Sequence, residues 1–105
     1  MKILFDHGTP VPLRREFSEH EVSTAFEMGW ASLSNGELLK AAEAAFDAFV
    51  TTDKNLRYQQ NLASRRLAIL VLPTTSWPQI QRQVAKVIDA ANRMKSGDFV
   101  ELQFE

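Results

Sequence analysis

The sequence contains no cysteine, which excludes disulfide bonds, thiolate zinc sites and cysteine nucleophiles. It also lacks an excess of one charge, because 12 basic side chains stand against 13 acidic ones, so no global positive field would attract nucleic acid. There is no uninterrupted run of about 18 apolar residues, and the chain starts without a basic leader or a long apolar segment. We therefore expect a cytoplasmic protein with no membrane partner, in which any contact with nucleic acid is local.

Apolar residues make up 45 % of the 105 residues, which is enough for an ordinary hydrophobic core. Compact domains typically contain about 50 to 250 residues, and the sequence shows no internal repeat, low-complexity tract or linker. These observations predict a single domain spanning residues 1–105.

Short apolar runs predict five β-strands. The run at 67–72 is continuously apolar, as expected for a strand covered on both faces. The segment 98–104 alternates between polar and apolar residues, which indicates a half-exposed strand. The remaining predicted strands are 2–5, 20–24 and 46–52.

Helical patterns occupy the segments between these strands. Ser34 and Glu37 have the spacing of a capping box before an alanine-rich helix, and Ser76 and Gln79 repeat that spacing. After Ser76, apolar residues recur at helical intervals up to Met94, which predicts one long helix. Shorter helical segments are predicted at 13–17, at 26–30 and at 55–63.

This alternation of strands and helices predicts an α/β fold, a three-layer α/β/α sandwich with a mostly parallel five-stranded sheet. We expect the strand order 2-1-3-4-5. In such sheets ligands bind beyond the carboxyl ends of the strands, where the order of winding reverses. In this order the reversal lies between the strands at 2–5 and 46–52.

Both of these strands run directly into an aspartate, Asp6 in the first and Asp53 in the third. The predicted order would bring the two carboxylates together across one crevice, where their repulsion favours a cation. The hard oxygen ligands suit Mg²⁺ or Mn²⁺. A metal of this kind promotes hydrolysis of a phosphodiester. Glu37 would supply a third carboxylate, and Asn55 a neutral oxygen or a hydrogen bond.

Each of these residues also has a structural interpretation. Asp53 is placed to cap a following helix, Asp6 to close a turn at Gly8, and Glu37 to complete the capping box with Ser34. The basic side chains that would line a phosphate-binding rim would otherwise be solvated helix faces: Arg14, Arg15, Lys40, Lys54 and Arg57. Three aromatic residues would either stack on bases or pack in the core: Trp30, Tyr58 and Trp77.

Three stretches together carry a family resemblance: Lys2–Asp6, Glu27–Trp30 followed by Asn35–Leu39, and Val50–Leu56. In this order and spacing the chain resembles the minimal PIN-like proteins, a family of unknown function, over nearly its whole length. The resemblance implies a PIN-type fold and a Mg²⁺- or Mn²⁺-dependent endoribonuclease, often the toxin of a toxin-antitoxin pair. Its implied partners are an RNA substrate and a small antitoxin protein.

By position, Asp6 and Asp53 match the first and central acidic residues of the family, and Glu37 matches the acidic residue at the start of the middle helix. Asn35 and Asn55 stand where relatives often have aspartates, so the resemblance implies weaker metal affinity. We therefore also expect Asn35, Asn55, Lys54, Arg57 and Arg14 to act around the metal ligands or on the substrate.

Two other functional hypotheses remain open. One is a catalytically weakened PIN-like module that binds a protein or RNA. The other is a receiver-type phosphoacceptor, which also has an aspartate after its third strand. Against the receiver, Asp6 lacks an acidic neighbour and no lysine follows the last strand. A homodimer that pairs strand edges at Val22 or Val100 is compatible with the sequence.

Overall fold

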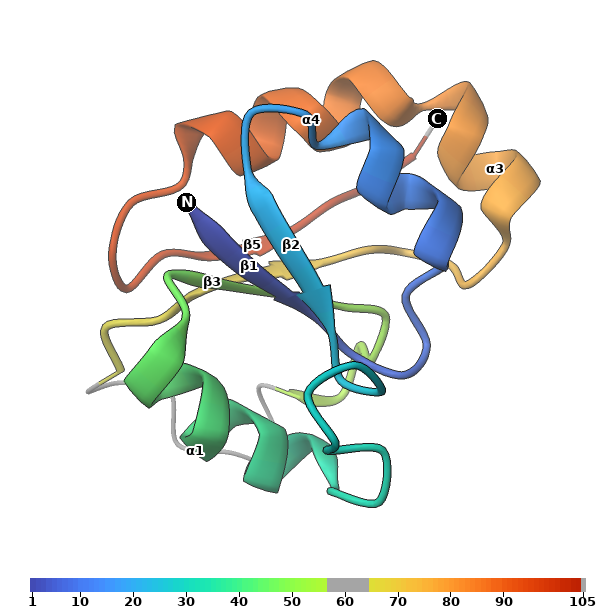
Figure 1. Cartoon of the computed structure of the whole chain (residues 1–105). Helices are drawn as coiled ribbons and strands as arrows, with labels where there is room; N and C mark the ends of the chain where they lie inside the picture. Colours follow the sequence, from blue (N-terminus) through green and yellow to red (C-terminus); the bar gives the residue numbers. More distant parts are fainter. Residues whose placement is uncertain (57–64, 105) are drawn as a thin grey trace.

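The computed structural model describes residues 1–56 and 65–104 and contains one five-stranded sheet (Figure 1). All four strand pairings are parallel, and the strand order is β2-β1-β3-β4-β5. This result confirms the predicted α/β class and the order 2-1-3-4-5. The strands are β1 (Lys2–Phe5), β2 (Glu21–Thr24), β3 (Ala48–Thr51), β4 (Ala68–Val71) and β5 (Phe99–Glu101).

Helices cover both faces of the sheet, which gives the three predicted layers. One face carries the 3₁₀ helix η1 (Val11–Glu16) with α3 (Trp77–Arg82) and α4 (Val84–Arg93), and the other carries α1 (Asn35–Ala45) (Figure 1). No helix among residues 1–56 and 65–104 is long and apolar enough to span a bilayer.

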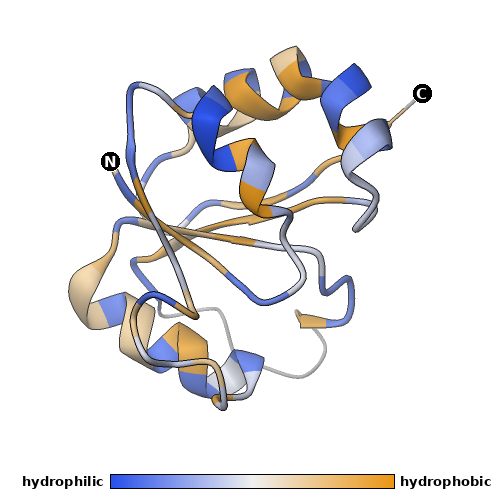
Figure 2. Ribbon diagram, turned by 45° about the vertical axis from the view of Figure 1, so that its right-hand side comes forward, coloured by the Kyte–Doolittle hydropathy of each residue, from blue (hydrophilic) through white to orange (hydrophobic). Residues whose placement is uncertain are grey.

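The two layers of core follow from the alternation of side chains along each strand. Ile3 and Phe5 of β1 pack on the face of η1 and α4, whereas Leu4 between them packs on the face of α1. Because both faces are covered, the central strands are apolar at nearly every position, and Figure 2 shows them in the colour of hydrophobic residues between the helices.

The predicted capping box begins α1. The backbone N–H of Glu37 donates to Ser34 Oγ at 3.2 Å, and Ser34 N–H donates back to Glu37 Oε1 at 2.9 Å. Of the second predicted capping box, the structure shows the bond in which Gln79 N–H donates to Ser76 Oγ at 3.4 Å, at the start of α3.

Several element boundaries differ from the prediction. The long helix after Ser76 is two helices, because Gln83 leaves helical geometry (φ −116°, ψ 21°) and ends α3 one residue before α4. The helix predicted at 13–17 is the 3₁₀ helix η1, which ends at Glu16, and the segment at 26–30 forms turns and no helix. The strand β5 is limited to three residues. The predicted helix at 55–63 falls almost entirely outside the described residues.

The chain leaves β1 and β3 towards opposite faces of the sheet. After β1 it enters η1, whose Leu13 lies in the core beneath α4, whereas Leu56 after β3 lies in the core beneath α1. Neighbouring strands whose connections diverge in this way leave a crevice at their carboxyl ends, which is the switch point expected for a ligand site.

Candidate active site at the switch point

A single hydroxyl joins the two predicted aspartates across β1 and β3. Thr51, at the end of β3 and fully buried, donates from Oγ1 to Asp6 Oδ2 at 2.5 Å. The same oxygen accepts the backbone N–H of Asp53 at 3.0 Å. The hydroxyl therefore connects the carboxylate of Asp6 with the backbone of Asp53, so the two residues are neighbours at the carboxyl ends of β1 and β3.

Asp6 is 5 % exposed and held by three hydrogen bonds. Besides Thr51, both the backbone N–H and the hydroxyl of Thr9 donate to Asp6 Oδ1, at 3.0 and 2.7 Å. Thr9 Oγ1 also lies 3.0 Å from the carbonyl oxygen of Val50 in β3. The turn after β1 thus fixes the orientation of this carboxylate against the neighbouring strand.

Asp53 is partly exposed, and its oxygens have different partners. Asp53 Oδ1 accepts the backbone N–H of Asn55 at 3.0 Å, which closes the turn after β3. Asp53 Oδ2 accepts the side-chain amide of Asn35 at 3.0 Å. Asn35 is the first residue of α1, so this bond connects the amino end of that helix to the switch point, as expected for a residue that supports Asp53.

The turn after β1 also touches the other loops of this edge. A Cβ added at Gly8 would collide with the hydroxyl oxygen of Thr52, so only glycine fits here without movement. His7 Nε2 lies 3.1 Å from the carbonyl oxygen of Leu33, in the loop that precedes α1. The turn after β1 is therefore in contact with Thr52 on one side and with the loop at Leu33 on the other.

Glu37, the predicted third carboxylate, is used in the helix cap. The backbone N–H of Ser34 and, less strongly, its side chain hold the pKa of Glu37 below the ordinary carboxyl value. Within residues 1–56 and 65–104, no hydrogen bond joins Glu37 to Asp6 or Asp53. From α1, Asn35 therefore contacts Asp53 directly, whereas Glu37 caps the amino end of the helix.

The basic residues predicted for a phosphate-binding rim have different surroundings. Arg14 donates to Glu27, and this hydrogen bond is the main cause that lowers the pKa of Glu27. Lys54 is exposed and lines a shallow hollow of about 100 Å³ beside Pro73 and Gln103, at the carboxyl ends of β4 and β5. Arg57 lies outside the described residues.

The aromatic residues that were weighed as base-stacking groups lie in or near the core. Trp30 packs edge to face against Phe46, with ring centroids 6.2 Å apart, and Trp77 packs against the core under α3. Tyr58 falls in the part of the chain that is not described. Phe26, by contrast, is 80 % exposed in the loop that follows β2.

The carboxylate oxygens of Asp6 and Asp53 are hard ligands of the type that Mg²⁺ takes in proteins. An ionised carboxylate offers about four lone-pair sites. Three donors approach Asp6 and two approach Asp53, so each carboxylate keeps unused acceptor capacity. Mg²⁺ is commonly bound through one or two carboxylates and several waters. Among the described residues no cluster of three or more His, Cys, Asp or Glu side chains surrounds a potential metal position.

Thr9 and Thr51 are the site residues that sequence reasoning did not identify. The run Thr51-Thr52-Asp53 did show polar residues at the end of an apolar strand. The partner of Thr51, however, depends on the register that sets Phe5 beside Val50, and this register cannot be read from one strand alone.

The fold and this site together define the chain as a parallel α/β protein in which Thr51 links Asp6 and Asp53 at the switch point. Comparison with protein-family models, with curated proteins and with solved structures finds no significant match.

Proposed function

We propose that the protein is a metal-dependent endoribonuclease of PIN-like type, acting on RNA in the cytoplasm. The observation that supports this most directly is the bridge through Thr51, which links the carboxylate of Asp6 to the backbone N–H of Asp53 at the switch point. Two fixed carboxylates at the carboxyl edge of a parallel sheet are suited to cation-assisted hydrolysis of a phosphodiester.

In this proposal Asp6 and Asp53 hold Mg²⁺ or Mn²⁺. When bound, such a cation polarises the phosphate and makes a bound water more acidic. The hydroxyls of Thr9 and Thr51 keep Asp6 from rotating, and the Asn35 amide orients Asp53. These hydrogen bonds fix the carboxylates before the substrate binds, so less entropy is lost in orienting them when the reaction takes place.

The biological role that goes with this activity is that of a toxin restrained by a small antitoxin protein. The resemblance to minimal PIN-like proteins supports this role. Asn35 and Asn55, which stand where relatives often have carboxylates, imply an enzyme that needs a higher metal concentration than its relatives.

The test is cleavage of a labelled single-stranded RNA by the purified chain with Mn²⁺, with and without EDTA. Asp6→Asn and Asp53→Asn should each abolish cleavage, because each removes half of the carboxylate pair. Asp89→Asn is the matched control, since Asp89 lies on α4 in an exposed pair with Arg93 and should leave cleavage unchanged. Cleavage that survives in both site variants would refute the nuclease.

A second candidate function is a PIN-like binding module that has lost its chemistry. It is favoured by the engagement of Asp6 with protein donors on both of its oxygens, which competes with a metal. Titration calorimetry separates the two functions. Heat of binding with Mn²⁺ supports the nuclease, whereas no heat with Mn²⁺ and tight association with a small protein encoded beside this one supports the module.

A further inference from the structure

Phe26 is more exposed than any other large apolar side chain in residues 1–56 and 65–104. An exposed aromatic ring offers an apolar face on which a flat partner such as a base can stack. We propose that Phe26 is the platform on which an unpaired base of single-stranded RNA stacks beside the aspartate pair. This inference rests on the proposed nuclease function and names the form of RNA that the site takes.

The position of Phe26 follows from strand pairing. The backbone N–H of Ala25 donates to the carbonyl oxygen of Phe5 at 3.0 Å, so the pairing of β2 with β1 continues to the residue before Asp6. Phe26 is the next residue, in the turn that follows β2. Adjacent strands lie about 4.8 Å apart, and β3 with Thr51 borders β1 on the other side.

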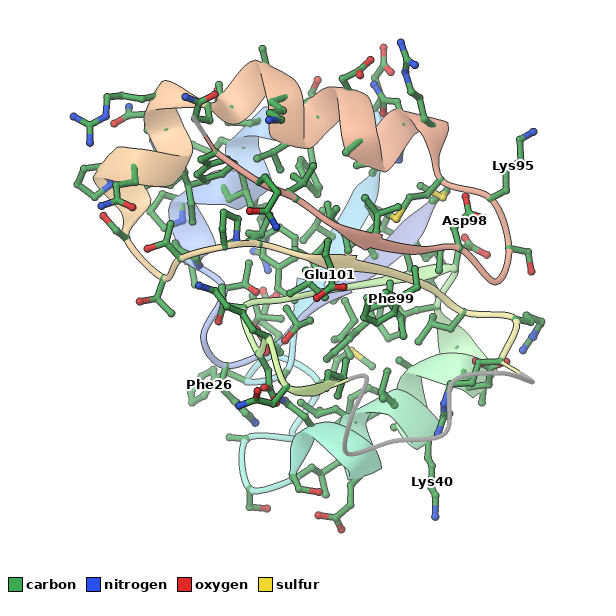
Figure 3. The ribbon with its side chains drawn as sticks, turned by 180° about the vertical axis from the view of Figure 1, so that it is seen from behind. Phe26, Lys40, Lys95, Asp98, Phe99 and Glu101 are labelled. Carbon is green, nitrogen blue, oxygen red and sulfur yellow. The ribbon has the colours of Figure 1, made fainter. Side chains whose placement is uncertain are left out.

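The turn that carries Phe26 therefore leaves the carboxyl edge of the sheet beside the strand that ends at Asp6, and β3 with Thr51 follows on the far side of that strand. Figure 3 shows Phe26 at the end of the molecule opposite Lys95 and Asp98, which precede β5 at the amino edge. A strand of RNA with its phosphate at the aspartates would consequently have a neighbouring base within reach of the ring.

The loop that carries the ring is fixed by backbone hydrogen bonds. Trp30 N–H donates to the carbonyl oxygen of Ala25 at 2.9 Å, and Met28 N–H donates to that of Thr24 at 3.1 Å. Gly29, at φ 78°, closes the turn in the left-handed conformation that glycine tolerates best. The backbone beneath Phe26 is thus already ordered, which lowers the entropic cost of stacking a base on its ring.

The electrostatics of this loop also suit a phosphate chain. Glu27, next to Phe26, is the nearest carboxylate in sequence, and Arg14 pairs with it. That pairing offsets a negative charge which would otherwise repel RNA at the edge of the site.

The small size of the apolar patch favours a base over a protein surface. One aromatic side chain buries about 150 to 250 Å², whereas a stable protein interface buries about 800 Å² on each partner. Beside Phe26, the loop exposes only part of Met28. An aromatic face of this size matches a single base, and bases are available for stacking in single strands rather than in duplex RNA.

The experiment measures binding of a 5′-labelled single-stranded RNA hexamer by fluorescence anisotropy. The full chain carries Asp53→Asn so that the RNA stays intact. Phe26→Ala should raise Kd about 5- to 150-fold, the range that loss of one base stack produces. Phe26→Trp should keep Kd near that of the parent because indole also stacks. Met28→Ala is the control from the same loop and should leave Kd unchanged.

The outcomes separate this inference from the nuclease itself. If wild-type protein cleaves RNA with Mn²⁺ but Phe26→Ala leaves Kd and KM unchanged, the nuclease stands and the stacking platform is refuted. If neither cleavage nor RNA binding occurs, both are refuted. If Phe26→Ala changes only the self-association of the chain and not its RNA affinity, the ring belongs to a protein contact and this inference falls. The exposure of Phe26 means that the alanine variant should melt at the wild-type temperature, so a change in Kd reports the contact and not the fold.

Discussion

Replacing Thr51 with valine should lower the free energy of unfolding by more than the small change in side-chain volume suggests. Valine has the shape of threonine, so the buried position stays filled and only the hydroxyl is lost. That hydroxyl bonds both the carboxylate of Asp6 and the backbone N–H of Asp53. A hydrogen bond to a charged group contributes about 1.5 to 3 kcal/mol, and a buried donor left without a partner costs about 1 to 3 kcal/mol. We expect a total loss of about 3 kcal/mol.

This loss converts to a melting temperature. Globular proteins unfold with an entropy of about 2.1 cal/mol/K per residue, which gives about 0.22 kcal/mol/K for this chain. A loss of about 3 kcal/mol therefore lowers Tm by about 14 °C. Urea denaturation followed by circular dichroism gives the free energy of unfolding directly, and a scanning melt gives Tm.

Two control variants show whether the hydroxyl at this position is responsible. Thr51→Ser keeps the hydroxyl and should lose only about 1 kcal/mol for the missing methyl group. Thr75→Val makes the same chemical change at an exposed residue of the next loop and should stay within about 0.5 kcal/mol of wild type. A Thr51→Val variant as stable as Thr75→Val would refute the bridge between the two aspartates.

Gly8→Ala should destabilise the fold by about 1 to 3 kcal/mol in urea denaturation, because the new methyl group must displace Thr52; an unchanged midpoint would contradict the close approach. Asn35→Asp replaces an amide donor to Asp53 with a like charge, so its Tm should fall in EDTA and rise more than that of wild type when Mn²⁺ is added. Equal responses to Mn²⁺ would argue against a cation beside Asp53. The lowered pKa of Glu37 means that its cap stabilises the fold above the ordinary carboxyl pKa of 4.5 and is lost as the pH falls through the folded-state value. Glu37→Gln should accordingly lose less stability than wild type between about pH 5 and about pH 2, measured by urea denaturation at each pH.

The sequence was informative wherever one local pattern decided the structure. Lys2–Phe5 and the run before Asp53 are apolar because both faces of the sheet are covered. The continuous apolar run in the sequence is enough to predict this burial. The capping box of Ser34 and Glu37 is equally local. The alternation of strands and helices indicated a parallel sheet, and the expected order 2-1-3-4-5, which the structure confirms, placed Asp6 and Asp53 on neighbouring strands.

The remaining features depend on contacts between distant segments. The break at Gln83 leaves the apolar periodicity intact, since both Ile80 and Val87 are buried, so the pattern alone could not reveal it. One partner of Asp6, Thr51, lies 45 residues away in sequence at the end of β3, and its contact depends on strand register. The exposure of Phe26 is also a tertiary property, since most phenylalanines beside apolar strands are buried.

The pairing of Thr24 with Glu27 limits how the sheet can grow. Glu21 and Ala25 direct their N–H groups to β1, so Val22 and Thr24 direct theirs outward. The outward N–H of Thr24 is taken by the Glu27 carboxylate at 2.9 Å, and its carbonyl oxygen by the N–H of Met28 at 3.1 Å. An incoming strand would therefore find only the peptide groups near Val22, too few hydrogen bonds to hold it. Copies of this chain should therefore not pair through the edge at β2, and this edge should resist fibrous aggregation.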